Sequence, residues 1–481
     1  MRITKIELKD FRAFKGHYVF DLHRAGHNLL VYGENGSGKS SLIQALDRFL
    51  ATTQGSPDFR PHQNIFVTTD DGYVKLHLDD PTAATADPEA GIYEWSATAN
   101  PVGKKVVREA AKTRGFLDYR ALLRTYFLYH GQDSVNLFHL LVEGFLAEIP
   151  NPANNRPFGP DWKQIKELLN GRLGWRRKQK LDALIADFNA GWTTTINGLQ
   201  AKAREVLAGF NYPIQIEMTP VQLGYQTGPK RISGDELVLK ATYCGRDIGR
   251  HQDFLNEAKL SAIALSIYFG ALLQLPPSKL RLLLLDDVLI GLDMVNRFPV
   301  IDILKRHFSA FQILFTTYDR AWFESMHEET KGGPWSKLEI TCGRSNGYDL
   351  PVVALNSSYM AKAEAFLEGG DYGSAANNLR KEMERILKKF CHENHVAVRY
   401  SKKLETNDLW TGLCGFSDPR SPTQLIIGQA QKQTIERYRR VVLNPGSHDD
   451  SANPLLEPEV RAAISEVKQL EAILFPPQSA T

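Results

Sequence analysis

Residues 33–40 of the chain are Gly33-Glu34-Asn35-Gly36-Ser37-Gly38-Lys39-Ser40, which satisfies the pattern G-x-x-x-x-G-K-[ST]. An apolar run, Asn28 to Tyr32, precedes this segment, and apolar residues at helical spacing, Leu42 to Leu50, follow it. A strand, a glycine-rich turn and a helix in this order aim backbone N–H groups and the positive end of a helix at a polyphosphate. Lys39 is expected to reach the β- and γ-phosphates, and the Ser40 hydroxyl to ligate Mg²⁺. The segment therefore predicts a site for ATP and Mg²⁺.

The second half of such a site is an apolar strand that ends in an acid. The leucine run Leu282 to Leu285 ends in Asp286-Asp287, and its composition is typical of a strand buried on both faces. Asp286 is expected to hold the magnesium shell, and Asp287 to polarise the attacking water. A further apolar run, Gln312 to Thr316, predicts another buried strand of the same sheet.

Composition sets broad limits on the class of protein. The 481 residues are 43% hydrophobic and 23% charged, close to the average for globular proteins. Because 58 Lys and Arg stand against 55 Asp and Glu, a net charge of +3, bulk charge gives no reason to expect nucleic acid as a partner. The four cysteines are far apart, which favours reduced thiols over a disulfide scaffold: Cys244, Cys342, Cys391 and Cys414.

The chain shows no targeting or membrane-spanning pattern. The first ten residues lack an apolar signal region. The longest apolar stretch, Leu260 to Leu275, falls short of the ~20 residues needed to cross a bilayer. We therefore expect a cytoplasmic protein with no membrane contact.

Alternation and helical spacing divide the chain into four expected parts. Strand patterns at 3–8, 18–22, 73–78 and 92–97 predict an opening hairpin extended by an antiparallel sheet, and four prolines within 150–160 indicate a loop. The expected parts are an N-terminal lobe with the phosphate loop (1–150), a helical arm or coiled-coil-like insertion (151–212), a C-terminal lobe (213–355) and a helical domain for partner binding or oligomerisation (356–481).

Helical spacing is clearest in the second and fourth parts. Apolar residues from Leu181 to Phe210 predict one long amphipathic helix, either a projecting arm or a helix packed flat on the core. In the third part, strand patterns at 213–218 and 237–243 precede a helix from about Asn256. Apolar stripes from Tyr372 to Phe390 and from Val460 to Leu474 predict helices after residue 355. The expected fold class is α/β with a mainly helical C-terminal domain.

Over roughly residues 1–330 the chain resembles the ABC-type ATPases of the SMC, RecF and double-strand-break-repair group. The resemblance implies a head domain with a mixed parallel core sheet, an added antiparallel sheet and a short helical arm. The motifs that carry it are Leu8-Lys9-Asp10-Phe11-Arg12-Ala13-Phe14, the phosphate loop through Ser41, Gln132, Leu255-Asn256-Glu257-Ala258-Lys259, Asp286-Asp287, Gly291-Leu292-Asp293 and Thr316-Thr317-Tyr318-Asp319.

The resemblance also implies roles for individual residues. In that family ATP lies between two heads. The resemblance therefore implies a head-to-tail dimer in which Asn256 of one head caps the γ-phosphate held by the other. Arg12 would lie close to the nucleotide, and Gln132, as the Q-loop glutamine, close to Mg²⁺. Asp293 would belong to the D-loop, and Tyr318 would stand at the switch position.

Three of these residues depart from the usual family pattern. Asn256 replaces a serine and can still donate a hydrogen bond through its amide. Asp287 replaces the glutamate of many members, so its carboxylate sits one methylene further back. Tyr318 replaces a histidine, and a phenol, which ionises only at roughly pH 10, is a poorer partner for phosphate. Together these departures predict tight ATP binding with slow hydrolysis.

An ABC-type head, a short arm and a helical C-terminal domain together are most similar to the stand-alone ATPases of bacterial anti-phage systems. The ATPase subunit of the PARIS system is the most similar, and the Septu-type ATPase, which pairs with an HNH nuclease, is a near competitor. This resemblance implies a homo-oligomer of head dimers, which could assemble to a hexamer. It would hold a separate TOPRIM-type nuclease inactive until a phage-encoded trigger protein is sensed, causing abortive infection.

Weaker patterns leave other interpretations open. Trp175 lies among Arg172, Arg176, Arg177, Lys178 and Lys180, which is either a solvated face or a phosphate-backbone patch of a DNA-repair ATPase that clamps DNA. Arg439-Arg440 followed by Asn444-Pro445-Gly446-Ser447-His448 vaguely resembles the motif of HEPN-type RNases, with a longer spacing. Cys391, His392 and His395 lie close together but match no zinc pattern.

Overall fold

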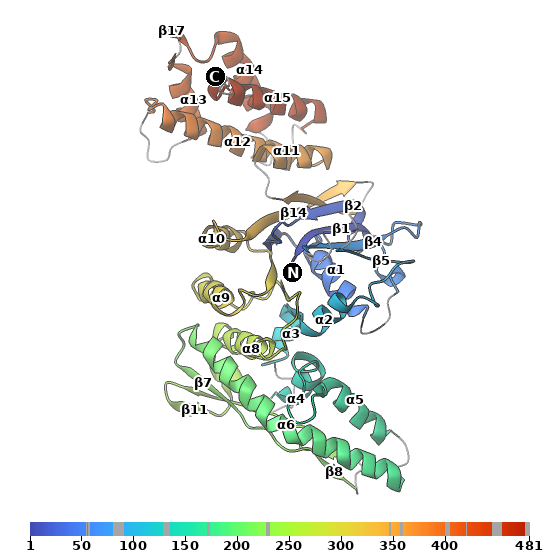
Figure 1. Cartoon of the computed structure of the whole chain (residues 1–481). Helices are drawn as coiled ribbons and strands as arrows, with labels where there is room; N and C mark the ends of the chain where they lie inside the picture. The colour runs from blue at the N-terminus through green and yellow to red at the C-terminus, as the bar shows by residue number, and fades with distance from the viewer. Residues whose placement is uncertain are drawn as a thin grey trace. The chain divides into compact units, whose positions relative to one another are not determined.

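The computed structural model describes the chain except for residues 54, 56–57, 80–90, 128–134, 171–173, 228–230, 346–347, 356–358, 400–404, 420, 445–454 and 477–481. The chain forms two compact units (Figure 1). The first contains Met1–Gly33 and Lys39–Lys337, and the second contains Leu338–Thr481 with the short segment Glu34–Gly38. The predicted fold class, α/β with a parallel core sheet, an antiparallel sheet and a mainly helical C-terminal part, is confirmed.

The first unit opens with a four-stranded antiparallel sheet. Its order is β2-β1-β4-β5, with β1 at Ile3–Phe11, β2 at Phe14–Asp21, β4 at Tyr73–Leu78 and β5 at Ile92–Ser96. The alternation of apolar and polar residues predicted this hairpin and its two added strands, because one face of each strand is buried.

The central layer of the first unit is a parallel sheet in the order β3-β13-β12-β6. The strands are β3 (Asn28–Gly33), β13 (Gln312–Thr317), β12 (Leu282–Asp286) and β6 (Gly115–Asp118). Every residue of β12 and β13 is buried, as expected for strands covered on both faces. The helix α1 (Lys39–Ala51) follows β3 and carries buried Leu42, Ile43 and Leu46. The strand, turn and helix predicted around residues 33–40 are therefore present.

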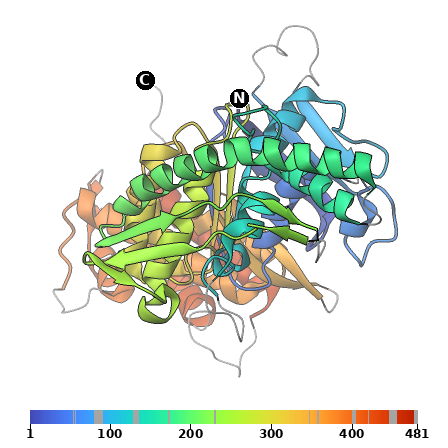
Figure 2. The ribbon, with the colours of Figure 1, turned by 90° about the horizontal axis from the view of Figure 1, so that it is seen from below.

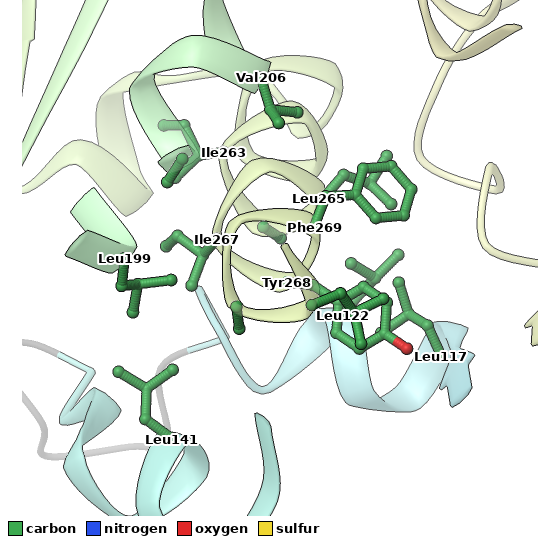
Figure 3. Close-up of a cluster of buried hydrophobic side chains, with 14 of the residues drawn as sticks. Leu117, Leu122, Leu141, Leu199, Val206, Ile263, Leu265, Ile267, Tyr268 and Phe269 are labelled. Carbon is green, nitrogen blue, oxygen red and sulfur yellow. The ribbon is translucent and has the colours of Figure 1, made fainter. Parts of the chain in front are cut away.

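The long helix predicted near Leu181 to Phe210 is α6 (Trp175–Ala208), and it packs on the core instead of projecting. Its buried stripe joins the same hydrophobic core as α8 (Glu257–Leu272). Figure 3 shows Leu199 and Val206 of α6 beside Ile263 and Ile267 of α8. α6 is the long green helix of Figure 2. Of the two arrangements open at the level of sequence, the packed helix is the one observed.

Close packing of α6 on α8 depends on a glycine. A Cβ on Gly270 would lie 2.8 Å from the backbone nitrogen of Ala203, whereas a Cβ on Gly198 would meet only the end of the Gln274 side chain. We expect Gly270→Ala to lower the free energy of unfolding by about 1 kcal/mol, because overpacking costs ~1–3 kcal/mol and helix propensity returns ~0.5–1 kcal/mol. Gly198→Ala is the matched control and should be neutral or stabilising. Urea denaturation of both variants measures this, and an unaffected Gly270→Ala would contradict the packing described.

The remaining elements of the first unit surround these layers. Two small antiparallel sheets have the orders β11-β10-β7 and β8-β9. The strands and helices not yet given are β7 (Ile214–Met218), β8 (Gly224–Gln226), β9 (Arg231–Ser233), β10 (Leu239–Tyr243), β11 (Arg246–Ile248), η1 (Arg60–His62), α2 (Lys105–Thr113), α3 (Tyr119–Leu123), α4 (Leu137–Leu140), the π-helical turn η2 (Leu141–Phe145), α5 (Phe158–Leu169), α7 (His251–Phe254), α9 (Met294–His307) and α10 (Arg320–Thr330).

The second unit has its own hydrophobic core, built mainly from α12 (Tyr372–Glu393) and α15 (Glu457–Leu474). The sequence pattern changes near residue 355, whereas this unit begins at Leu338, because the hairpin of β14 (Trp335–Ser345) and β15 (Tyr348–Leu355) leads into the helices. A buried ion pair joins Glu339 of β14 to Lys362 of α11 (Tyr359–Glu368). The other elements are α13 (Thr406–Cys414), β16 (Ser417–Asp418), β17 (Ser421–Leu425), α14 (Gln429–Tyr438) and the π-helical turn η3 (Arg439–Leu443).

Among the helices described, none combines the length and apolar character required to cross a membrane.

Candidate nucleotide site

The candidate site lies at the carboxyl ends of the parallel strands. β12 ends at Asp286, which pairs in register with Thr316 of β13, and Thr317 of β13 pairs with Tyr32 of β3. The strand ends Asp286, Thr317 and Gly33 therefore share one edge of the sheet. This is the edge at which ligands bind in open α/β sheets.

The segment Glu34–Gly38 connects the end of β3 to the start of α1. Gly36 and Gly38 have φ values of 86° and 99°, a backbone conformation that residues with a Cβ rarely adopt. Ser37 between them is 1% exposed, and among the described residues its Oγ has no hydrogen-bond partner. The positive φ angles and the unpartnered hydroxyl match the cradle that Gly33, Glu34, Asn35 and their neighbours were predicted to form.

Lys39 and Asp287 face one another in the first unit. Lys39, the first residue of α1, is 4% exposed, and its Nζ lies 3.7 Å from Oδ2 of Asp287. The other carboxylate oxygen of Asp287, Oδ1, is buried with no partner among the described residues. A buried ammonium beside an acceptor that lacks a hydrogen bond is suited to binding a phosphate group and a water molecule.

The surroundings of Asp287 disfavour the ionised form of its side chain. Burial raises the pKa of its carboxyl group, Lys39 opposes this, and the neighbouring Asp286 adds to it. Its φ of 51° is left-handed, a region in which Asp and Asn are tolerated better than longer side chains. The left-handed backbone is a physical reason for aspartate instead of glutamate at this position.

The raised pKa of Asp287 predicts a pH-dependent cost to stability. A carboxyl group whose pKa is higher in the folded than in the unfolded chain destabilises the fold when ionised, and this cost disappears as pH falls through the raised pKa. We expect the melting temperature of Asp287→Asn, relative to that of the wild type, to be higher near neutral pH than at about pH 4. Thermal melts across pH measure the difference. Asp302→Asn, at an exposed position of α9, should show no such pH dependence. A relative melting temperature of Asp287→Asn that does not fall with pH would contradict the argument.

Thr316 connects the two aspartates and was not predicted from the sequence. Its Oγ1 donates to Oδ1 of Asp286 (2.7 Å) and accepts from the backbone N–H of Asp287 (3.2 Å). The hydroxyl thus holds both acids in place from the neighbouring strand. The sequence signal for this role is weak: a threonine at the end of a buried strand that pairs with the acidic strand.

The residues present fit a magnesium ion. Asp286 is 9% exposed with one oxygen bonded to Thr316, and at the start of α1 Ser40 is exposed and Ser41 half-buried. Carboxylate and hydroxyl oxygens beside a phosphate loop are the ligands that Mg²⁺ takes in such sites. Ser40 and Asp286 would therefore hold Mg²⁺, which when bound would neutralise charge on the phosphates.

The switch-position residue Tyr318 directly follows β13. Its side chain is 41% exposed, and its backbone N–H opposes the rise in the pKa of the Asp287 carboxyl group. The next residue, Asp319, accepts from the backbone N–H of Trp322 and begins α10. Tyr318 therefore lies beside the candidate water-activating group, with which it lines a small pocket.

Asn256 and Asp293 each cap a helix. Oδ1 of Asn256 accepts from the backbone N–H of Lys259 at the start of α8, which leaves its amide N–H₂ for other partners. Oδ1 of Asp293 accepts from the backbone N–H of Asn296 at the start of α9. A Cβ on Gly291 would lie 2.4 Å from Ser261 Oγ, so the D-loop packs directly against α8. The predicted capping role of Asn256 toward a second head remains a prediction.

Two of the predicted nucleotide contacts, Arg12 and Gln132, remain predictions. Arg12, in a turn with φ of 49°, lies beside Arg48 of α1 and His62. Burial lowers the pKa of Arg12 and of His62, and the positive charge of Arg48 lowers both further. Arg48 is nine residues along α1 from Lys39, about 13 Å at the helical rise of ~1.5 Å. Gln132 lies outside the described residues.

The weaker patterns have mixed outcomes. Trp175 is 73% exposed and Arg176, Lys178 and Lys180 are exposed with it, but the Arg177 guanidinium donates to backbone carbonyls at the end of α5. Arg172 and His448 lie outside the described residues. Within the described part of the chain, no three His, Cys, Asp or Glu side chains gather as metal ligands around Cys391 or elsewhere.

Comparisons with known proteins find a family match in the N-terminal part of the chain. The family described as AAA ATPase domain matches residues 1–85, which include the phosphate loop. A comparison with curated proteins finds no match.

Solved structures similar to the chain include three SMC heads. The Smc head bound to the C-winged helix domain of ScpA has 14% identity and a TM-score of 0.41, with 75% of this chain and 100% of that chain covered. An Smc head domain with an extended coiled coil, bound to the C-terminal domain of ScpA and derived from Pyrococcus furiosus, has 15% identity, a TM-score of 0.43 and coverage of 76% and 98%. The SMC head domain from Thermotoga maritima has 14% identity, a TM-score of 0.36 and coverage of 74% and 99%. These values describe a distant likeness.

Proposed function

We propose that the chain is an ABC-type ATPase of the SMC/RecF kind that binds ATP with Mg²⁺ and hydrolyses it slowly. The observation that carries this proposal is the buried pair of Lys39 and Asp287, 3.7 Å apart, at the edge where β3, β12 and β13 end. The match of residues 1–85 to AAA ATPase domains supports it.

Each residue in the proposal acts through a specific group. Backbone N–H groups of Glu34 to Ser41 and the Lys39 ammonium bind the phosphates, while Ser40 and Asp286 hold Mg²⁺. Asp287 orients a water molecule and accepts its proton, and Thr316 keeps the two acids in register. Tyr318 offers a phenol to the γ-phosphate where a histidine is usual. Slow hydrolysis follows from the short Asp287 side chain and from this phenol.

The test is steady-state hydrolysis by the purified chain. We expect Mg²⁺-dependent turnover well below the ~10 s⁻¹ typical of enzymes. Turnover at or above that value would contradict a slow switch. Turnover no greater than that of Lys39→Ala, at saturating ATP, would contradict ATPase function.

At the level of the cell, we propose that the protein is an ATP-dependent homo-oligomeric scaffold of anti-phage defence in the cytoplasm. Its heads would pair head-to-tail and could assemble further. The scaffold would sequester a nuclease effector and release it when a phage protein is sensed. The second unit, Leu338–Thr481, supports this proposal because it has a helical core of its own and could bind a partner.

Native mass spectrometry of the protein purified from its own host, with neighbouring genes intact, tests the scaffold. A stoichiometric nuclease on the wild-type assembly, lost in Lys39→Ala, is the expected result. An oligomer that carries no second protein would contradict it.

An ATP-dependent DNA clamp is the second candidate function, favoured by exposed Trp175 among exposed Arg176, Lys178 and Lys180. A clamp with several phosphate contacts must bind DNA more tightly with ATP, and its affinity must fall steeply with salt. Reversing the charge of Arg176, Lys178 and Lys180 should then abolish binding, and full affinity in that variant would eliminate this candidate.

A further inference from the structure

Arg297 occupies a buried position next to Asp287 that the proposed function does not yet explain. It lies in the first turn of α9, four residues after Asp293, and is 8% exposed. A small pocket beside the site is lined by Arg297 together with Asp287, Ile290 and Tyr318. Burying an arginine is costly unless its donors are paired, so its partners indicate what it is for.

The guanidinium of Arg297 connects two loops. Its Nε donates to the carbonyl oxygen of Leu292 in the D-loop (2.7 Å), and its Nη1 donates to Oδ2 of Asp319 after β13. The guanidinium carbon of Arg297 lies over the ring of Trp322, 6.0 Å from the ring centroid. A planar fork with donors on two sides can make both bonds at once, which a lysine ammonium on a flexible stem does less well.

Both loops that Arg297 connects adjoin Asp287. The loop after β13 includes Tyr318, which lines the same small pocket as Asp287, and Asp319 donates its backbone N–H to Oγ1 of Thr317. The segment from Asp287 to Leu292 leads from the carboxylate into the D-loop, whose Leu292 N–H donates to Leu289. A shift of either loop would therefore move the groups around the Asp287 carboxylate. A side chain that bonds both loops would limit such shifts.

We propose that Arg297 is a positioning residue that ties the D-loop, Gly291–Asp293, to the loop Thr317–Asp319 and so sets the geometry in which Asp287 activates water. The proposal rests on the proposed ATPase function and adds a residue to it. Arg297 itself need not touch the nucleotide, and its effect on hydrolysis passes through Leu292 and Asp319.

The kinetic test compares three variants with a control. Arg297→Gln and Arg297→Lys break or weaken the fork, and Asp319→Asn removes its ionic partner while keeping an N-cap residue on α10. Arg306→Gln removes an exposed charge from the same helix and is the control. We expect turnover to fall about 10- to 100-fold in the three variants with ATP affinity nearly unchanged, because a misplacement of ~1 Å can cost ~100-fold in rate. Arg297→Gln combined with Asp319→Asn should be no slower than either single variant.

A second readout does not depend on hydrolysis. Amide hydrogen exchange of Leu292 should become faster in Asp319→Asn, because a change in one loop is transmitted to the other through Arg297. Arg306→Gln should leave this exchange unchanged.

The outcomes distinguish a failure of the Arg297 proposal from a failure of the proposed ATPase function. Turnover within threefold of wild type in Arg297→Gln, or unchanged Leu292 exchange in Asp319→Asn, overturns the role of Arg297. Loss of ATP affinity in parallel with turnover in Asp319→Asn also overturns it, because a purely structural role predicts that result. Wild-type turnover no greater than that of Lys39→Ala overturns the proposed function, and the exchange measurement then still decides whether Arg297 couples the loops.

Discussion

Asp287→Asn should leave ATP bound and nearly abolish its hydrolysis. Removing a general base lowers a rate by ~10²–10⁴-fold, and the amide cannot accept the proton that the carboxylate accepts. Binding should change little, because the phosphate contacts come from the loop and from Lys39. Asn tolerates the left-handed backbone at φ 51°, so the fold is preserved.

Single-turnover hydrolysis and equilibrium ATP binding measure the two effects separately. Asp302→Asn, on an exposed face of α9, is the control for loss of one negative charge. Asp287→Glu should not exceed the wild-type rate, because a longer side chain in the left-handed region has to shift the backbone. Hydrolysis by Asp287→Asn within tenfold of wild type would exclude Asp287 as the base.

Lys39→Ala should weaken ATP binding by about 10- to 150-fold, since charge-assisted hydrogen bonds contribute ~1.5–3 kcal/mol each. The substitution also removes the cation that opposes the rise in the pKa of Asp287, so the carboxylate would lose its ionic partner. Hydrolysis should fall to background.

Titration with a fluorescent ATP analogue measures the loss of affinity, with Lys279→Ala as the exposed control. Affinity of Lys39→Ala within twofold of wild type would refute the assignment of the phosphate loop. If ATP drives oligomer formation, the same variant should remain in its nucleotide-free assembly state at any ATP concentration.

The parts of the site that could be predicted are local in sequence. The phosphate loop is eight consecutive residues between a strand and a helix, and Asp286-Asp287 closes a run of four leucines. Such segments carry their own pattern, because the chemistry requires particular residues at fixed spacing.

The parts that could not be predicted depend on contacts between distant segments. Thr316 acts on Asp286 from thirty residues away, and Arg297 binds Asp319 across two loops. Neither residue type is distinctive where it stands. Helical periodicity likewise predicted α6 but could not tell which surface would cover its apolar stripe, because that surface is α8, which begins 49 residues after α6 ends. The hairpin of β14 and β15 was missed because Gly343 and Pro351 interrupt its alternation.

The buried pair of Glu339 and Lys362 has a practical consequence for dividing the protein into fragments. A head fragment that ends near residue 355, where the sequence changes character, would contain the carboxylate without its ammonium. Such a cut also removes α11, so the fragment loses the ion pair and exposes the surface that this helix covers. Truncation at that point would therefore produce a fragment prone to unfolding and aggregation, and its inactivity would say nothing about the nucleotide site. Fragments of this protein should keep Glu339 and Lys362 on the same side of the cut.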